Sequence, residues 1–241
     1  MSDYIRPGAS HPDRPLPSHE VFVTADKILM NHAEFLVDAA QAGIHDVASL
    51  MRSPMRIRAL GEQWAEGDYG STEYFTNRAD IHDETGRHDG QLLWNALRRD
   101  LAADPYRDSS PHLGYMLISR DLTAAGSDDQ LLNFIFGATD KEIGQTVQSV
   151  YRFLEAGLSP DQIALVTKHI ARHEFGHLVG LDSDTIRNQD KRGGIYQGHC
   201  VNECTMQQVM SVSETVSLAT KLQHKHRAGF CSDCAGYLAH K

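Results

Sequence analysis

Apolar residues recur at helical spacing in the first part of the chain. They predict a helix over residues 25–43, with Thr24 suited to cap its start and Gly43 expected to end it. A second helical stretch is predicted over residues 45–61, with an interruption at Pro54.

The next segment is polar. Residues 61–90 contain several glycines and predict a long loop, whereas residues 91–104 return to helical spacing and predict another amphipathic helix. The loop gathers side chains that could bind a metal ion, but such a group is more typical of a solvated loop: His82, Asp83, Glu84, His88 and Asp89.

The pattern changes near residue 113. Short apolar runs bounded by turn residues predict strands over residues 113–122, 133–140 and 146–154. A long helix should follow, because Ser159 is a good N-cap, with Pro160 at the first helical position and Gln162 where a capping box requires it. This helix is expected to end at Gly180, since glycine readily adopts the conformation that terminates a helix.

These patterns divide the chain into three parts. Residues 1–20 hold four of the eight prolines and predict an irregular arm. Residues 21–112 are expected to be mostly helical and to pack with residues 113–241 as one compact unit. The end of the chain, residues 181–241, is polar and has few apolar residues at regular spacing. It therefore needs a further interaction to stabilise its fold.

Composition narrows the class of protein. In 241 residues, 41% are hydrophobic and 23% are charged, which is typical of a soluble globular protein. The net charge of −9 comes without a basic stripe, which argues against a nucleic-acid partner. No run of about 18 apolar residues is present, so no membrane span is expected. The N-terminus lacks the apolar segment of a signal peptide, and the cytoplasm is the expected compartment.

The long helix carries the most specific chemistry, in the order H-E-x-x-H. His173 and His177 lie four residues apart, so their imidazoles project from one helical face and can hold one zinc ion. Glu174 can take a proton from a zinc-bound water without being a ligand. His169 shares this face, one turn earlier, and is expected to pack or to support the ligands.

All four cysteines lie near the C-terminus. Cys200 and Cys204 form one pair, and Cys231 and Cys234 form another. Four thiolates favour a closed, structural zinc site. Two local disulfides, or a redox pair at Cys231 and Cys234, are the alternatives.

The order of these motifs resembles the archaemetzincins, zinc metallopeptidases of the metzincin clan, over residues 113–236. Their motif reads H-E-x-x-H-x-x-G-x-x-H-C-x4-C-x-M-x17-C-x-x-C, and this chain contains "HEFGHLVG", "HC", "CTM" and "CSDC" in the same order. The resemblance implies an α+β, metzincin-like zincin fold: a small mixed, twisted sheet, a zinc-binding active-site helix, and a C-terminal subdomain stapled by a four-cysteine zinc site. It therefore implies two zinc ions, one catalytic and one structural.

The third ligand of the catalytic zinc departs from this motif. The position three residues after Gly180 is Ser183, a poor zinc ligand, and the "HC" pair comes only after an insertion. The resemblance therefore assigns the third-ligand role to His199, which keeps its neighbouring cysteine. Asp182 and Asp184 are the alternatives.

The family also has a methionine below the metal. The C-x-M spacing assigns this role to Met206, with Met210 as the alternative because it lies closer to the last cysteine pair.

The implied function is a metallopeptidase that cleaves peptide bonds by Glu174-assisted attack of zinc-bound water on a peptide or protein substrate. Residues 133–140 are the candidate for an edge strand that pairs with the substrate. Three other interpretations stay open. A glutamate such as Glu203 or Glu214 could complete the zinc site, the fold could bind peptides with little or no catalysis, or the C-terminal cysteines could act in redox chemistry.

Overall fold

The computed structural model describes residues 20–59, 72–81, 91–104, 112–124, 132–182, 184–192 and 196–241. The predicted arm up to residue 19 and Ser183 lie outside the described residues. Of the loop predicted over residues 61–90, residues 61–71 and 82–90 also lie outside them, whereas residues 72–81 form helix α3 (Thr72–Ile81), so the prediction of a loop was wrong there. The possible metal ligands of that loop, His82 to Asp89, lie outside them as well.

A five-stranded sheet forms the centre of the fold, in the order β2-β1-β4-β7-β6. All neighbours are parallel except β6 and β7, which are antiparallel, so the sheet is mixed. Its strands are β1 (Glu20–Ala25), β2 (Arg56–Ala59), β4 (Leu113–Ile118), β6 (Gly137–Asp140) and β7 (Gln145–Ser149). A short parallel pair, β3 (Leu92–Leu93) and β5 (Leu122–Thr123), forms a second sheet.

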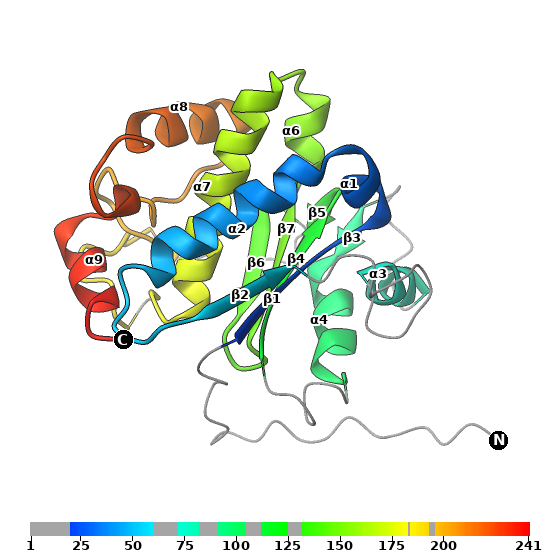
Figure 1. Ribbon diagram of the computed structural model, residues 1–241, viewed down its shortest axis with the longest axis horizontal. Coiled ribbons are helices and arrows are strands. Elements are labelled where there is room, and N and C mark those ends of the chain that lie inside the picture. Colours follow the sequence, from blue (N-terminus) through cyan, green and yellow to red (C-terminus); the bar gives the residue numbers. More distant parts are fainter. Residues whose placement is uncertain are drawn as a thin grey trace.

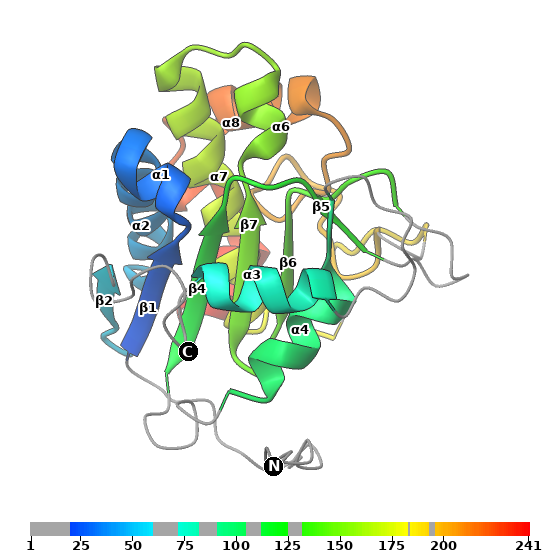
Figure 2. The same ribbon diagram turned by 90° about the vertical axis from the view of Figure 1, so that its right-hand side faces the viewer.

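Helices cover both faces of the central sheet (Figures 1 and 2). Helices α2 and α7 pack on one face, and α3 and α4 lie on the other. Strand β4 is buried throughout: Tyr115 and Leu117 point into the core beneath α2 and α7, and Met116 and Ile118 point into the other core. The helices are α1 (Lys27–His32), α2 (Glu34–Ala48), α3 (Thr72–Ile81), α4 (Trp94–Ala102), α6 (Tyr151–Glu155), α7 (Pro160–Leu178), α8 (Val212–Leu222), α9 (Ser232–Leu238) and the 3-10 turn η2 (Arg227–Gly229). Among the helices in these ranges, none combines the length and apolar character needed to cross a membrane.

The prediction of helix at the start of the chain was partly wrong. Residues 20–25 form β1 and residues 56–59 form β2, where helix or helix cap had been expected. β1 pairs with both β2 and β4, so partners far apart in sequence override the local helical pattern. Asp26, not Thr24, caps the first helix, and its side chain accepts a hydrogen bond from Leu29 N at 3.0 Å.

Gly43 does not end a helix, as had been expected, but lies inside α2. A Cβ atom at this position would lie 2.5 Å from the backbone oxygen of Lys168 and 2.7 Å from the Cβ of Ala171, both in α7. The glycine therefore permits the close crossing of α2 and α7, and so fixes α7, which carries His173 and His177, against the core.

Helix α7 follows the prediction closely. Ser159 and Gln162 form the capping box, with Pro160 in the first turn. Gly180 has a φ of +101°, and two backbone hydrogen bonds close the end of the helix, Gly180 N to His177 O and Leu181 N to Gly176 O, both at 2.9 Å.

Other elements differ in extent from their predictions. The second predicted strand is regular only over Gly137–Asp140, and the third ends at Ser149, where α6 begins two residues later. The polar C-terminal segment contains two helices, α8 and α9, which were not expected. Residues 92–93 pair as β3 before helix α4 begins.

Candidate metal centre and active-site cleft

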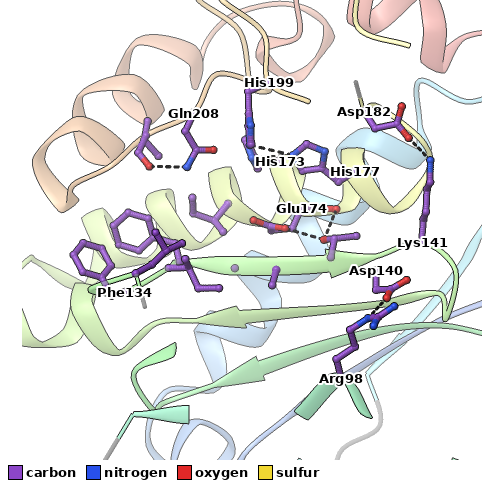
Figure 3. Close-up of a pocket in the computed structure, with 18 of the residues that line it drawn as sticks. Arg98, Phe134, Asp140, Lys141, His173, Glu174, His177, Asp182, His199 and Gln208 are labelled. Carbon is purple, nitrogen blue, oxygen red and sulfur yellow. Dashed lines mark hydrogen bonds and ion pairs between the residues drawn. The ribbon is translucent and has the colours of Figure 1, made fainter. Parts of the chain in front are cut away.

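Three imidazoles converge at one side of α7. His173 and His177 lie on consecutive turns of the helix, and His199 approaches from the loop before the cysteines (Figure 3). The Nε2 atom of His177 lies 3.2 Å from Nε2 of His173 and 3.3 Å from Nε2 of His199. Three nitrogen atoms so close together can share one metal ion.

The second nitrogen of each ring contacts a backbone carbonyl oxygen. Nδ1 lies 2.8 Å from Thr205 O in His173, 2.6 Å from Leu181 O in His177, and 3.1 Å from Gln197 O in His199. A carbonyl only accepts, so each Nδ1 carries the hydrogen and each Nε2 keeps a lone pair for a metal.

The rings are also held in their neutral form. Burial lowers the pKa of His177 to about 3, and it lowers the pKa of His173 and of His199 as well. Neutral imidazole is the metal-binding form, so all three rings are ready to bind an ion at neutral pH.

Two of these carbonyl groups are positioned by turns. The glycine turn at the end of α7 directs Leu181 O back to His177. Thr205 is held by η2, because its N–H donates to Gly229 O at 3.0 Å and its hydroxyl donates to Ala228 O at 2.8 Å.

Glu174 lies beside the imidazoles and faces β6 (Figure 3). Its Oε2 accepts a hydrogen bond from the Thr139 hydroxyl at 2.8 Å. Burial raises the pKa of the Glu174 carboxyl to about 7, although the hydrogen bond from Thr139 opposes this shift. The carboxylate thus lies close to the imidazoles with a pKa suited to proton transfer near neutral pH.

The two candidate methionines lie in different places. Met206 is fully buried, and its sulfur lies against Gly176, in the turn between His173 and His177. Met210 is 41% exposed and lines the cleft. Of the two candidates, Met206 is the one that packs against the helical turn between His173 and His177.

The carboxylates weighed as alternative ligands lie outside the group of three histidines. Asp182 pairs with Lys141, and Asp184 is exposed. Glu203 pairs with Lys225, and Glu214 accepts a hydrogen bond from Met210 N at 2.8 Å. His169 is buried on the same helix, and neither ring nitrogen has a hydrogen-bond partner among the described residues.

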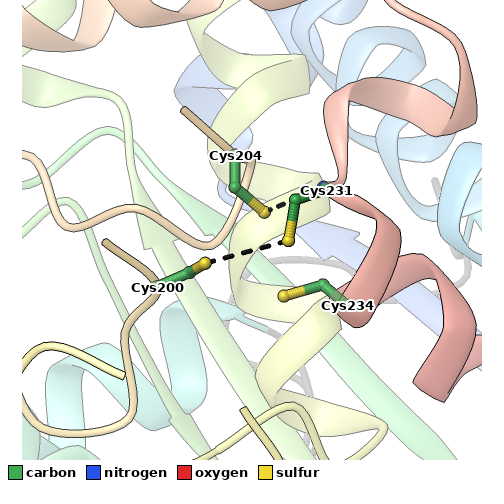
Figure 4. Close-up of side chains that lie close together, drawn as sticks. All are labelled: Cys200, Cys204, Cys231 and Cys234. Carbon is green, nitrogen blue, oxygen red and sulfur yellow. Dashed lines mark hydrogen bonds between the residues drawn. The ribbon is translucent and has the colours of Figure 1, made fainter. Parts of the chain in front are cut away.

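The four cysteines form a second cluster (Figure 4), which begins at Cys200, the residue after His199. Their sulfur atoms lie within 4.8 Å of one another, and none of them is in a disulfide. Cys204 Sγ accepts hydrogen bonds from Cys231 N at 3.3 Å and from Met206 N at 3.5 Å. The two pairs therefore come together as one four-thiolate group, as the sequence analysis had favoured.

The charges within this cluster favour a cation. Hydrogen bonds from Cys204 and Cys234 lower the pKa of the Cys200 thiol, whereas the hydrogen bond to Cys200 raises the pKa of Cys204 and that of Cys234. One thiolate therefore suppresses ionisation of its neighbours. A divalent cation among the sulfurs would remove this conflict, and four thiolates suit tetrahedral zinc.

A cleft of about 630 Å³ opens over the imidazoles. Its walls are β6, α7 and the segment after Met206, with aromatic side chains such as Phe134 toward one end and charged pairs toward the other (Figure 3). The charged pairs are Arg98 with Asp140 and Lys141 with Asp182.

Strand β6 is an edge strand of the central sheet in the described part of the chain. Ser149 N donates to Phe136 O at 2.9 Å, and bonded pairs alternate along an antiparallel ladder. The backbone groups of Gly137 and Thr139 therefore point away from β7, and could pair with an extended chain lying in the cleft.

Several residues of this site had no signal in the sequence. Gly137 and Thr139 were included only in a predicted strand, and Thr205 contributes a backbone carbonyl, which any residue type could supply. The alternation within "GATD" places Gly137 and Thr139 on one face, but only the packing of β6 on α7 directs that face to Glu174.

Comparison with known proteins bears on the fold. No protein-family model matches this chain, and no curated protein matches it. Archaemetzincin from Methanopyrus kandleri, known from a crystal structure at 1.5 Å resolution, matches with a TM-score of 0.55 and 21% identity, over 93% of this chain and 96% of that one. A zinc-dependent peptidase from Methanocorpusculum labreanum has a TM-score of 0.48 and 14% identity, over 90% of this chain and 99% of that one. The likeness to the first confirms an archaemetzincin-like fold for this chain.

Proposed function

Starting from an archaemetzincin-like fold, we propose that this protein is a zinc-dependent metallopeptidase that hydrolyses peptide bonds. The observation that carries the proposal is the placement of Glu174 beside three convergent imidazoles, in a cleft bordered by β6, an edge strand among the described strands. Metal-binding rings, a base and a surface for an extended chain occur together there.

The donor sets suit two different zinc sites. His173, His177 and His199 would hold a catalytic ion, since three nitrogen ligands leave one position open toward the cleft. The four cysteines would hold a structural ion, because four thiolates close the coordination shell. Zinc in the histidine site would polarise the substrate carbonyl and lower the pKa of a water molecule.

Glu174 is the general base in this proposal. Its carboxylate would accept the proton of the attacking water and then deliver it to the nitrogen of the leaving group. A pKa near 7 suits both steps, because the group can accept a proton and release it at neutral pH.

The substrate would be an extended segment of peptide or protein. It would lie along β6 and bond to the outward backbone groups of Gly137 and Thr139. Main-chain pairing of this kind brings a peptide carbonyl close to the imidazoles whatever the side chains of the substrate. It therefore supports peptidase activity in general and does not indicate which substrate sequence is preferred.

Glu174→Gln tests the proposal against a matched control. Turnover of a peptide library should stop with a chelator and return with zinc. Glu174→Gln should keep its zinc but lose turnover by at least about 100-fold. The control is Glu142→Gln, which alters an exposed carboxylate at the rim of the same cleft and should retain activity.

Two results would reject the peptidase proposal. One is wild-type turnover in Glu174→Gln. The other is a zinc-loaded wild type that binds peptides without cleaving any of them, since this would indicate a binding module on a peptidase fold.

A further inference from the structure

The carboxylate of Glu174 is held from the sheet side by one hydroxyl group. Thr139 Oγ1 lies 2.8 Å from Glu174 Oε2 and 3.1 Å from the backbone oxygen of Glu174. It also lies 3.0 Å from the hydroxyl of Thr146, in the neighbouring strand β7. A hydroxyl donates only one hydrogen, and an ionised carboxylate is the strongest of these acceptors, so Thr146 donates to Thr139 and Thr139 donates to Glu174.

Gly137 provides the space for this arrangement. Gly137 and Thr139 are two residues apart in β6, so both positions face α7. A Cβ atom on Gly137 would lie 2.7 Å from the carboxyl carbon and from Oε1 of Glu174. The carboxylate therefore lies between the backbone of Gly137, which has no side chain, and the hydroxyl of Thr139, which donates a hydrogen bond to it. We call this space between Gly137 and Thr139 the slot.

The slot matters because the same carboxylate could act as a metal ligand. Zinc binds aspartate and glutamate oxygens as well as imidazole nitrogens. Glu174 follows His173 directly. The direction of its side chain therefore decides whether Glu174 acts as a base or becomes a fourth ligand of the metal. A fourth protein ligand would fill the position that catalysis requires to be open.

We propose that Thr139 is a positioning residue, which holds the Glu174 carboxylate against β6 and away from the metal. This inference rests on the proposed function of Glu174. The backbone of Thr139 faces the substrate side of β6 while its side chain faces Glu174, so the same residue would align the substrate chain and the base.

The key variant is Thr139→Val, which keeps the branched shape of the side chain and removes the hydroxyl. Its kcat should fall by about 10- to 100-fold, the range expected for a misplaced catalytic group. Its KM should change by less than about twofold, because the outward backbone groups remain. Thr139→Ser restores the hydroxyl and should recover most of kcat. Thr24→Val, in strand β1, controls for the same replacement elsewhere in the sheet.

Cobalt(II) absorption provides a second measurement, independent of turnover. Cobalt in place of zinc has visible bands that weaken when the coordination number rises. Thr139→Val should change the bands of the histidine site as the carboxylate reaches the ion, whereas Thr139→Ser and Thr24→Val should leave them as in the wild type. Gly137→Ala, which displaces the carboxylate from the opposite end of the slot, should lower kcat in the same way.

The outcomes separate this inference from the proposed function. If Thr139→Val has the kcat and the cobalt bands of the wild type, the proposed role of Thr139 is overturned. Glu174→Gln would then still test whether Glu174 is the general base. If the wild type shows no turnover, the peptidase proposal fails, and the cobalt bands alone decide whether Thr139 restrains the carboxylate. If Thr139→Val does not fold, Thr139→Ala provides the same comparison in a smaller side chain.

Discussion

The sulfur atom of Met206 lies directly beneath Gly176. A Cβ atom on Gly176 would come within 2.7 Å of it, a distance that side chains do not tolerate. Gly176 lies between His173 and His177, so Met206 packs against the turn of α7 that joins the two imidazoles.

Gly176→Ala should therefore destabilise the protein and weaken metal binding. Either Met206 or α7 must move, and overpacking of this kind costs about 1–3 kcal/mol. The comparison is Gly236→Ala in α9, where an added Cβ meets no atom within 4 Å. That change should leave the free energy of unfolding equal or higher, because alanine favours helix. Urea unfolding and zinc titration of both variants measure the difference, and equal behaviour of the two would contradict the role of the contact.

His199 and Asp182 can be compared directly as third ligand. His199→Ala removes one of three convergent nitrogens and should weaken zinc binding at the histidine site by more than about 100-fold, since loss of an outer-shell partner alone costs about 10- to 100-fold. Asp182→Asn breaks only the pair with Lys141 and should retain the ion. Competition with a chromogenic chelator gives both affinities. Loss of zinc from Asp182→Asn but not from His199→Ala would reverse the assignment.

Loss of metal from the cysteine cluster should weaken metal binding at the histidine site, whereas loss of metal from the histidine site should not affect the cysteine cluster. His199 and Cys200 are neighbours in sequence, Cys200 N donates to Met206 O at 2.8 Å, and Thr205 O holds His173. If the cysteines hold a structural zinc and the histidines a catalytic zinc, as proposed, Cys234→Ser should lose the structural ion and bind the catalytic ion more weakly. His173→Ala should lose only the catalytic zinc. Zinc stoichiometry by mass spectrometry under native conditions distinguishes the two patterns, and full retention of the catalytic ion in Cys234→Ser would show that the sites are independent.

His169 should make the protein sensitive to mild acid. Burial lowers the pKa of this ring to about 3, so the folded state keeps it neutral, while in the unfolded state the ring takes up a proton below its ordinary pKa of 6.5. Stability should then fall as the pH decreases from about 6.5, by up to about 1.4 kcal/mol per pH unit from this residue.

His169→Leu removes that contribution, so its stability should depend less on pH than that of the wild type. The other buried histidines are present in both proteins and cancel in the difference. Urea unfolding at about pH 7.5 and about pH 5 measures the effect, with His224→Leu as an exposed control. Parallel pH profiles for wild type and His169→Leu would show that His169 gains a partner, such as a buried water, in solution.

Local signals in the sequence were sufficient to predict helix α7. Ser159, Pro160 and Gly180 act within one turn of each helix end, so the limits of α7 and the alignment of His173 with His177 could be predicted. Strands β1 and β2 could not, because their apolar residues also fit a helix, and only the pairing of β1 with β2 and with β4 decides between helix and strand.

The remainder of the candidate site depends on contacts between distant segments. His199 was assigned through its neighbour Cys200 and a family resemblance, since the spacing from His177 does not predict it. Thr139 contributes a side-chain hydroxyl from an edge strand, and Thr205 contributes a backbone oxygen. Neither contribution can be recognised in a single sequence. Their roles follow from the packing of β6 and of the segment after Cys204 onto α7.

The anchoring of His199 from both sides along the chain has a consequence for changes in chain length. Asp190 N donates to His199 O at 2.8 Å, and Cys200 N donates to Met206 O at 2.8 Å. An insertion between Asn188 and Met206 would shift the pairing of Gln189 with Cys200, whereas one before Asn188 would lengthen the chain outside these contacts. Extra residues between Gly180 and His199 are thus best accommodated before Asn188.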